Sequence, residues 1–145
     1  MPKLLFRIPT HGRVLVCLLL TALAGCGSQG DRPEIGQVRG KVVQAGTPLA
    51  GAIVTFSPDS GGRTSQAMTD DNGVYDLIYM GQDKGAKIGT HKVRITTAYE
   101  GLDPKTGQTV EKKEVVPKRY NSTETELTAD VKPGPNEVDF QLEAK

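Results

Sequence analysis

From residue 37 onward, apolar and polar residues alternate in short runs along the chain. Typical examples are Val93-x-Ile95 and Val138-x-Phe140-x-Leu142, in which every second residue is apolar. A period of two is typical of strands that bury one face and expose the other. No run carries apolar residues at helical spacing between recognisable caps. The pattern therefore predicts an all-β protein of about seven short strands, arranged as a sandwich or a barrel.

One parity of each strand is expected to face the interior and form the core. The apolar residues that share this parity are Val42, Leu49, Val54, Phe56, Tyr75, Leu77, Val93, Ile95, Val131, Val138, Phe140 and Leu142. His91 has the same parity as Val93, so we expect a satisfied, partly buried imidazole there. An error of one residue in the register would turn the whole set toward solvent.

Turn-forming sequences separate the runs. They occur at residues 45–48 and 57–62, and residues 132–136 (Lys-Pro-Gly-Pro-Asn) are expected to close the last pair of strands. Residues 70–73 (Asp-Asp-Asn-Gly) predict a hairpin, because Asn-Gly readily supplies positive φ at both central positions.

Residues 98–117 form the one long connection. Within it, residues 103–107 (Asp-Pro-Lys-Thr-Gly) have the composition of a type I turn followed by a left-handed glycine. A structureless loop of this length would be unusual in a compact domain. We therefore expect a polar β-ribbon that projects from the sandwich, with arms near 96–102 and 107–113.

The amino terminus differs from everything after it. A basic stretch over residues 1–13 precedes an apolar run over residues 14–24, which is followed by small residues. The run is too short for a bilayer, which needs about 20 apolar residues. A buried core helix is the alternative, but the positive flank and the lack of an amphipathic period favour a secretory signal peptide.

The end of this segment, Leu23-Ala24-Gly25-Cys26, resembles the lipobox of bacterial lipoproteins. The resemblance implies cleavage after residue 25, acylation of Cys26, and a mature protein anchored on a membrane of the bacterial cell envelope. Two or three acyl chains give stable anchoring. Gly27 by the same resemblance favours the outer membrane over the periplasmic face of the inner one. A disulfide is disfavoured, because Cys17 would be removed with the signal peptide.

The expected organisation is thus a signal peptide over 1–25, a flexible tether over 26–36 and one domain over 37–145. Formal net charge is +1, and three basic residues precede residue 26. The remainder carries 15 basic against 17 acidic side chains. This balance argues against a nucleic-acid-binding surface, which needs clustered positive charge.

The domain also shows a familiar set of motifs. They are Val38-x-Gly40, Gly46-x-Pro48-Leu49-x-Gly51-Ala52, Thr69-Asp70-x-Asn72-Gly73-x-Tyr75, Val116-Pro117-x-x-Tyr120 and Gly134-x-Asn136-x-Val138-x-Phe140. Together they resemble the carboxypeptidase regulatory-like (transthyretin-like) domain of small bacterial lipoproteins over residues 37–143. The resemblance implies a seven-stranded Greek-key sandwich and accessory, folding-support or surface-display roles, with no single activity. His91 departs from the pattern, since the family often has an aromatic residue there.

The domain has few residues of the types that catalytic and metal sites require. Hydroxyisourate hydrolases share the transthyretin-like fold but use two histidines, whereas His91 alone would remain after processing. A Ser-His-Asp triad would depend on the same His91. A structural zinc site needs about four Cys or His ligands, which this domain lacks. Residues 70–72 could supply some oxygen ligands to calcium, but a plain turn is the favoured interpretation. We expect no catalytic residue, no bound metal and no cofactor.

Binding is the remaining function. We select Tyr99, Lys105 and Tyr120 as candidate binding residues, on loops that sandwich proteins commonly use. The absence of Trp weakens a glycan platform. The sequence predicts a lipid-anchored cell-envelope module with a non-enzymatic structural or protein-interaction role; the alternative is a glycan- or peptide-binding accessory domain.

Overall fold

Strand β1 (Ile35–Gln44) organises the first of two six-stranded sheets in this computed structural model, which describes residues 33–102 and 106–144. Its antiparallel partners are β2 (Thr47–Pro48), β5 (Val74–Asp76) and β8 (Ala86–Lys87). Its parallel partners are β13 (Pro135–Glu137) and β14 (Phe140–Leu142). The segment around Val138 can pass close to β1 because residue 40 is glycine, and a Cβ at this position would overlap the carbonyl of Val138.

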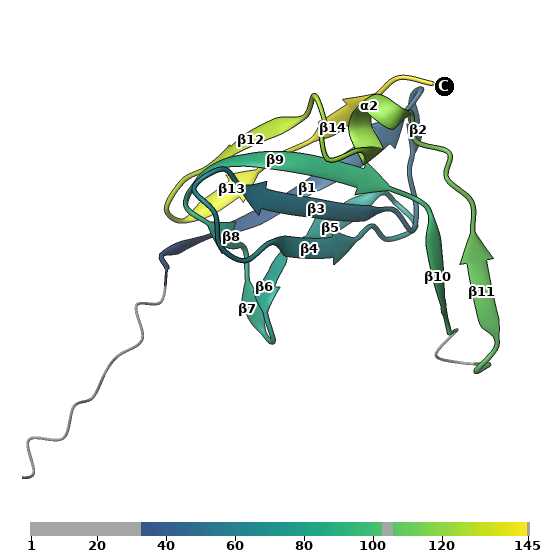
Figure 1. The fold of residues 1–145 in the computed structure, drawn as a ribbon, viewed down its shortest axis with the longest axis horizontal. Helices are drawn as coiled ribbons and strands as arrows, with labels where there is room; N and C mark the ends of the chain where they lie inside the picture. Colours follow the sequence, from purple (N-terminus) through teal and green to yellow (C-terminus); the bar gives the residue numbers. More distant parts are fainter. Residues whose placement is uncertain (1–32, 103–105, 145) are drawn as a thin grey trace, which may run out of the picture. The chain divides into compact units, whose positions relative to one another are not determined.

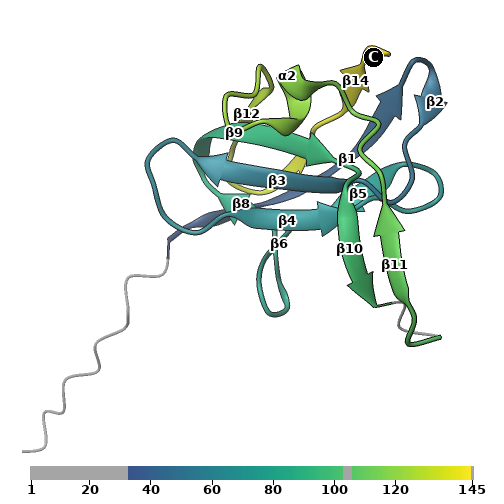
Figure 2. The same ribbon diagram turned by 45° about the vertical axis from the view of Figure 1, so that its right-hand side comes forward.

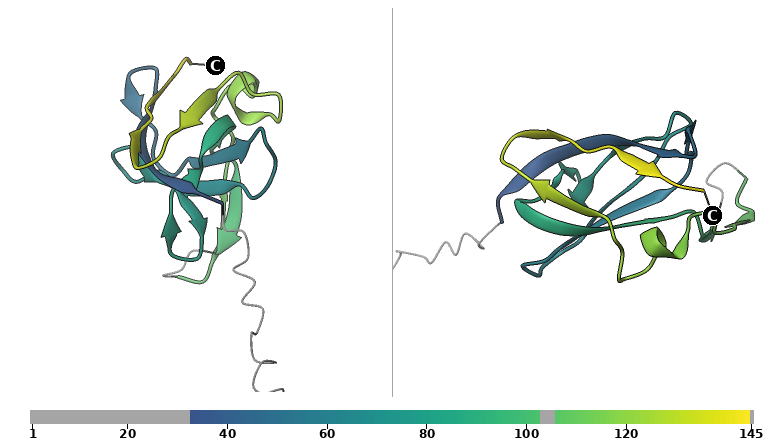
Figure 3. Two further views of the ribbon diagram at one scale, coloured as in Figure 1. Left: turned by 90° about the vertical axis from the view of Figure 1, so that its left-hand side faces the viewer. Right: turned by 90° about the horizontal axis from the view of Figure 1, so that it is seen from above.

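The second sheet has the strand order β12-β9-β3-β4-β6-β7. Its members are β3 (Ile53–Pro58), β4 (Ser65–Met68), β6 (Ile78–Met80), β7 (Asp83–Lys84), β9 (Gly89–Thr96) and β12 (Thr128–Val131). The two sheets form separate layers (Figures 1 and 3). The predicted all-β sandwich is therefore confirmed, although many of its strands are only two to four residues long.

The core lies between the two sheets, as the alternating pattern predicts. Val54 and Phe56 are fully buried, which confirms the register. Ten of the twelve predicted core residues are buried, while Leu49 and Val138 are only partly buried against the cluster. Additional buried apolar side chains come from Val38, Ala52, Ala86, Val116, Tyr120 and Ala129.

Aromatic rings fill the centre of this core. The ring of Phe56 lies 6.4 Å from that of Tyr75 and 6.2 Å from that of Phe140. The Tyr75 hydroxyl donates a hydrogen bond of 2.6 Å to the Val138 carbonyl. Burial, and then the nearby charge of Asp139, raise the pKa of Tyr75 above its usual range. This phenol therefore stays a neutral donor that ties the aromatic cluster to the strand ends.

The turn over residues 70–73 differs from the predicted hairpin. Asp70 Oδ1 accepts hydrogen bonds from the backbone N–H groups of Asn72 and Val74, both at 2.9 Å. Gly73 has φ +74°, but Asn72 is not at positive φ. The strands on either side, β4 and β5, belong to different sheets, so the turn carries the chain across the sandwich. Residues 132–136 likewise connect β12 of one sheet to β13 of the other, and do not close a pair.

A turn with two positive φ values does occur, at Ala45 (φ 50°) and Gly46 (φ 81°) between β1 and β2. This is the type I′ geometry that a two-residue hairpin favours. Ala45 is the one non-glycine residue at positive φ among residues 33–102 and 106–144. Its Cβ makes this conformation unfavourable.

The domain begins slightly earlier than predicted. Ile35 and Gly36 pair with Lys87 and Ala86, so the last two residues assigned to the tether belong to β1. The predicted signal peptide and Cys26 lie outside the described residues. In the described part of the chain, no helix is long and apolar enough to cross a membrane; α2 (Lys118–Asn121) is a single turn.

Candidate interaction surface

Strands β10 (Tyr99–Leu102) and β11 (Thr109–Lys112) form the predicted ribbon. They are antiparallel, with Tyr99 opposite Lys112 and Leu102 opposite Thr109. Gly107 has φ +68°, the left-handed conformation expected of it, while residues 103–105 lie outside the described residues. The ribbon projects away from both sheets (Figures 1 and 2). The prediction of a β-ribbon with two arms is confirmed, but the ribbon is less polar than predicted, because Tyr99, Leu102 and Val110 are exposed on it.

The base of the ribbon is fixed by the carboxylate of Glu114. It accepts hydrogen bonds from the Thr96 hydroxyl, from the backbone N–H and hydroxyl of Thr97 (3.1 and 2.9 Å), and from Val116 N–H (2.9 Å). Burial raises the pKa of Glu114, but these hydrogen bonds outweigh it and lower the pKa to about 2. The ionised carboxylate therefore joins the end of β9 to the segment that follows β11.

A second contact supports the same base. Lys112 Nζ donates a hydrogen bond of 2.6 Å to the carbonyl of Ala50, in the loop between β2 and β3. The first cross-strand pair of the ribbon, Tyr99 with Lys112, is thus tied to the sandwich through a backbone acceptor. The ribbon leaves the domain in a direction set by hydrogen bonds on both of its arms.

Large exposed apolar side chains are concentrated on a few elements of the domain. In the described residues, six of the seven such side chains belong to β4, to β6 and to the ribbon, and the seventh is Val115. We refer to these six residues together as the two-hairpin face: Met68, Ile78, Met80, Tyr99, Leu102 and Val110. Met68 lies on β4, which pairs with β6 at the base of the β6–β7 hairpin. The register of the ribbon places Tyr99 and Val110 on one of its sides and Leu102 on the other, so a partner must contact both sides of the ribbon. Leu102 is the most open, with 66% of its surface exposed.

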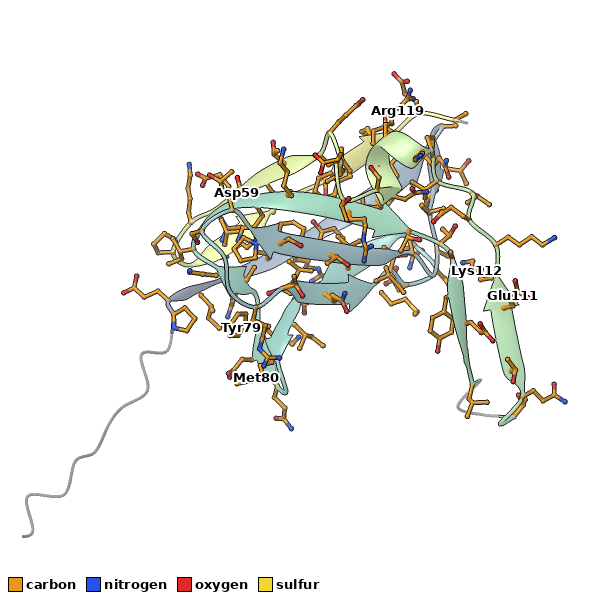
Figure 4. The ribbon with its side chains drawn as sticks, viewed as in Figure 1. Asp59, Tyr79, Met80, Glu111, Lys112 and Arg119 are labelled. Atoms are coloured by element: carbon orange, nitrogen blue, oxygen red, sulfur yellow. The ribbon has the colours of Figure 1, made fainter. Side chains whose placement is uncertain are left out.

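The two hairpins that carry this face point the same way. The β6–β7 hairpin and the ribbon both project toward the bottom of Figures 1 and 2. Figure 4 labels Met80 on the first and Glu111 and Lys112 on the second. Monomeric proteins rarely expose large clustered apolar surfaces, and those that do commonly use them for binding.

Tyr99 is the one predicted binding residue that the structure places on this face. It is 37% exposed, and its ring lies over the backbone of Gly101, where a Cβ would overlap it. With Glu100, Glu111 and Lys112 it borders a shallow groove of about 290 Å³. Gly101 therefore sets the orientation of the ring along the ribbon.

The prediction of Tyr120 as a binding residue is wrong. Tyr120 lies in α2, is 8% exposed, and belongs to the core. The Arg119 guanidinium covers its ring at 4.9 Å from the centroid. The single helical turn after Pro117 directs this ring inward, so Tyr99 and Tyr120 do not form a joint platform. Lys105 and Cys26 lie outside the described residues.

His91 is more deeply buried than predicted. It is fully buried, its ring lies 5.6 Å from that of Phe56, and its Nε2 lies 2.7 Å from the Lys87 carbonyl. Because a carbonyl only accepts, Nε2 must donate, and Nδ1 has no hydrogen-bond partner in the described residues. The predicted satisfied imidazole therefore uses only one of its two nitrogens.

Residues 70–72 provide a turn, since one Asp70 carboxylate oxygen serves two backbone N–H groups. In the described part of the chain, no three His, Cys, Asp or Glu side chains lie close enough together to bind a metal ion.

The exposed apolar residues of β6 were not identified from the sequence. Leu77 faces inward, so the apolar Ile78 and Met80 at the opposite parity could have indicated an exposed apolar patch.

No protein-family profile and no curated protein matches the sequence. Among solved structures, the fold is similar to part of BcpA, the major pilin subunit of Bacillus cereus, with 13% identity and a TM-score of 0.46 over 78% of this chain and 31% of that one.

Two further solved structures show similarity of the same order. One is a DUF3823 family protein from Parabacteroides merdae ATCC 43184, with 15% identity and a TM-score of 0.40 over 78% of this chain and 48% of that one. The other is a 9R-lipoxygenase from Cyanothece PCC8801, with 13% identity and a TM-score of 0.42 over 94% of this chain and 21% of that one. This chain spans less than half the length of each of the three structures. Similarity at this level carries no information on activity or partners.

Proposed function

We propose that this protein is an exported, lipid-anchored module of the bacterial cell envelope that binds another envelope protein through the two-hairpin face and has no catalytic role. The observation that carries the proposal is that, in the described residues, five of the seven large exposed apolar side chains lie on the two projecting hairpins and a sixth, Met68, lies on the adjacent β4, while Val115 lies elsewhere. Burying such side chains against a partner is favourable by about 25 cal/mol per Å² of apolar surface.

The anchor rests on the sequence before residue 33. The apolar run over residues 14–24 and Leu23-Ala24-Gly25-Cys26 support acylation of Cys26, on the outer membrane or on the periplasmic face of the inner one. The polar residues after Cys26 support a tether that lets the domain reach a partner on the same membrane. The resemblance to carboxypeptidase regulatory-like domains agrees with such an accessory role.

A non-enzymatic role is supported by the placement of His91. A general base must reach the proton that it abstracts, whereas this imidazole is enclosed between the sheets beside Phe56. The carboxylate with the clearest pKa shift, Glu114, is engaged by Thr96, Thr97 and Val116. Both groups are engaged in the packing of the domain.

The experiment is quantitative co-purification of envelope proteins with the full chain, extracted from its native membrane after mild crosslinking. We expect Leu102→Ser and Met80→Ser each to reduce the captured partner at least fivefold. Val115→Ser is the matched control, because Val115 is similarly exposed but lies outside the two-hairpin face. Equal capture by all three variants and the unsubstituted protein would contradict the proposal.

The anchor has a separate test. Intact-mass analysis of the membrane-extracted protein should show a chain that begins at Cys26 and carries diacylglyceryl and acyl groups. Cys26→Ser should accumulate as the unprocessed precursor. A mature chain with a free thiol, or with a different first residue, would contradict lipid anchoring but leave the protein-binding face untouched.

A further inference from the structure

The outer face of the second sheet carries a polar groove with a volume of about 450 Å³. Strands β3, β4 and β9 form its floor, and residues from the loops after β3 and after α2 border it. The lining side chains on which the argument rests are Thr55, Ser57, Gln66, Lys92, Arg94 and Thr123.

Hydrogen bonding and register hold the floor of the groove in place. Thr55 points away from the core, because it alternates with the buried Val54 and Phe56, yet it is only 4% exposed. Gln66 Nε2 donates a hydrogen bond of 3.2 Å to its hydroxyl, and Arg94 stands opposite it on β9. In the described residues the Gln66 side-chain carbonyl accepts no hydrogen bond, so it can accept one from a ligand.

The groove has an excess of positive charge. Lys92 and Arg94 lie two residues apart on β9, so both project from the same face at a spacing of about 7 Å. Neither forms an ion pair within residues 33–102 and 106–144. Asp59, labelled in Figure 4, is the one carboxylate among the lining residues. An anion placed between the two cations would relieve their repulsion, and the planar guanidinium fits a carboxylate with two parallel hydrogen bonds.

The rest of the lining is hydroxylated. Ser57, Thr123 and four other Ser or Thr residues border the groove together with one amide, and Pro58 is the one apolar residue among them. Side-chain pockets for a peptide are therefore lacking, and hydroxyl groups of a ligand meet matching donors and acceptors. With no aromatic ring in the lining, a sugar cannot be held by stacking, so charge must supply the affinity.

A larger groove on the first sheet, of about 640 Å³, has no excess of positive charge. Its two cations, Arg39 and Lys41, are matched by the carboxylates of Glu137 and Asp139. Asp139 also accepts a hydrogen bond of 2.7 Å from the backbone N–H of Lys41. The two grooves therefore differ both in charge balance and in hydroxyl content, since the lining of the first-sheet groove includes no Ser or Thr.

We propose that the Lys92–Arg94 groove binds an acidic saccharide, with a uronate carboxylate between the two cations and sugar hydroxyls against Ser57, Gln66 and Thr123. This site shares no residue with the two-hairpin face, although Gln66 at its edge is paired with Ile78. A domain tethered to a membrane surface would thereby contact charged polysaccharide beside that membrane.

The test is isothermal titration of the full chain in detergent with trimers of galacturonate, mannuronate and guluronate. At least one trimer should bind with submillimolar Kd at low salt, at least tenfold more tightly than its neutral methyl ester. Arg94→Gln and Lys92→Gln should each weaken that binding about tenfold, which corresponds to about 1.4 kcal/mol. Lys132→Gln removes the same charge from an exposed turn away from the groove and should have little effect.

Three outcomes would overturn the proposal. They are no binding of any acidic trimer, equal binding of a tetraglutamate peptide, and an equal loss in Lys132→Gln. The peptide result would indicate a surface that attracts any acid without recognising sugar. Since both substitutions lie on a solvent-facing side of β9, thermal unfolding should confirm unchanged folding, and Thr123→Ala provides a second, uncharged probe of the groove.

Discussion

Replacing Glu114 by glutamine is expected to loosen the base of the ribbon. The carboxylate accepts hydrogen bonds from two backbone N–H groups, Thr97 and Val116, and from the hydroxyls of Thr96 and Thr97. Glutamine keeps one acceptor oxygen and a similar shape but removes the negative charge. The substitution therefore isolates what the charge contributes.

The expected magnitude follows from the pKa. Burial raises it, but the hydrogen bonds bring it down from the usual 4.5 to about 2. At about 1.4 kcal/mol per pH unit the shift would correspond to roughly 3 kcal/mol. Because the carboxylate is partly exposed, solvent screening reduces this, and we expect Glu114→Gln to lower the free energy of unfolding by about 1–2 kcal/mol at pH 7.

The pH dependence has a definite sign. A carboxylate whose pKa is lowered by folding stabilises the fold above its unfolded pKa, and this contribution disappears as the pH falls through the folded pKa. The difference between the two proteins should thus be largest above about pH 4.5 and vanish near pH 2.

Urea unfolding between pH 2 and pH 7 measures this difference, with Glu124→Gln as a control at an exposed glutamate. Amide hydrogen exchange at Thr97 and Val116 should also accelerate in Glu114→Gln at neutral pH. A difference that stays constant from pH 7 to pH 2, or that equals the effect of Glu124→Gln, would refute the reasoning.

Three further changes test the packing and the turns. Phe56→Ala should lower the free energy of unfolding by about 3–5 kcal/mol in urea titrations, because it opens a cavity in the aromatic core. Ala45→Gly should raise it by about 1 kcal/mol, since φ +50° strains alanine; a loss of stability would contradict the type I′ assignment. Replacing residues 100–111 with Asn-Gly joins the paired Tyr99 and Lys112 directly. This shortened protein should unfold at nearly the original urea concentration and lose its captured partner; failure to fold would make the ribbon structural.

The sandwich could be predicted because burial in a strand follows a period of two. Val54 and Phe56 alternate with a polar outer face, and the same alternation gave the correct inward parity for nearly the whole core. The ribbon was predictable for a similar reason, since turn chemistry around Gly107 is local. Information that lies within a few neighbouring residues is thus recoverable from the sequence.

What could not be predicted depends on contacts distant in the chain. Residues 70–73 specify a turn, but nothing local indicates that β5 joins β1 across the sandwich. Tyr120 was assigned to the surface, yet one helical turn packs it beneath Arg119. That the β6–β7 hairpin and the ribbon project in the same direction depends on how both hairpins leave the sandwich.

The most direct test of the central claim is site-specific photocrosslinking in living cells. A photoreactive amino acid is placed at Leu102 or at Met80, with Val115 as a reference position whose exposure is close to that of Met80. The account predicts that the two hairpin positions yield an adduct with the same envelope protein, while position 115 yields none. Adducts of equal intensity at all three positions, or different proteins crosslinked at Leu102 and Met80, would contradict it.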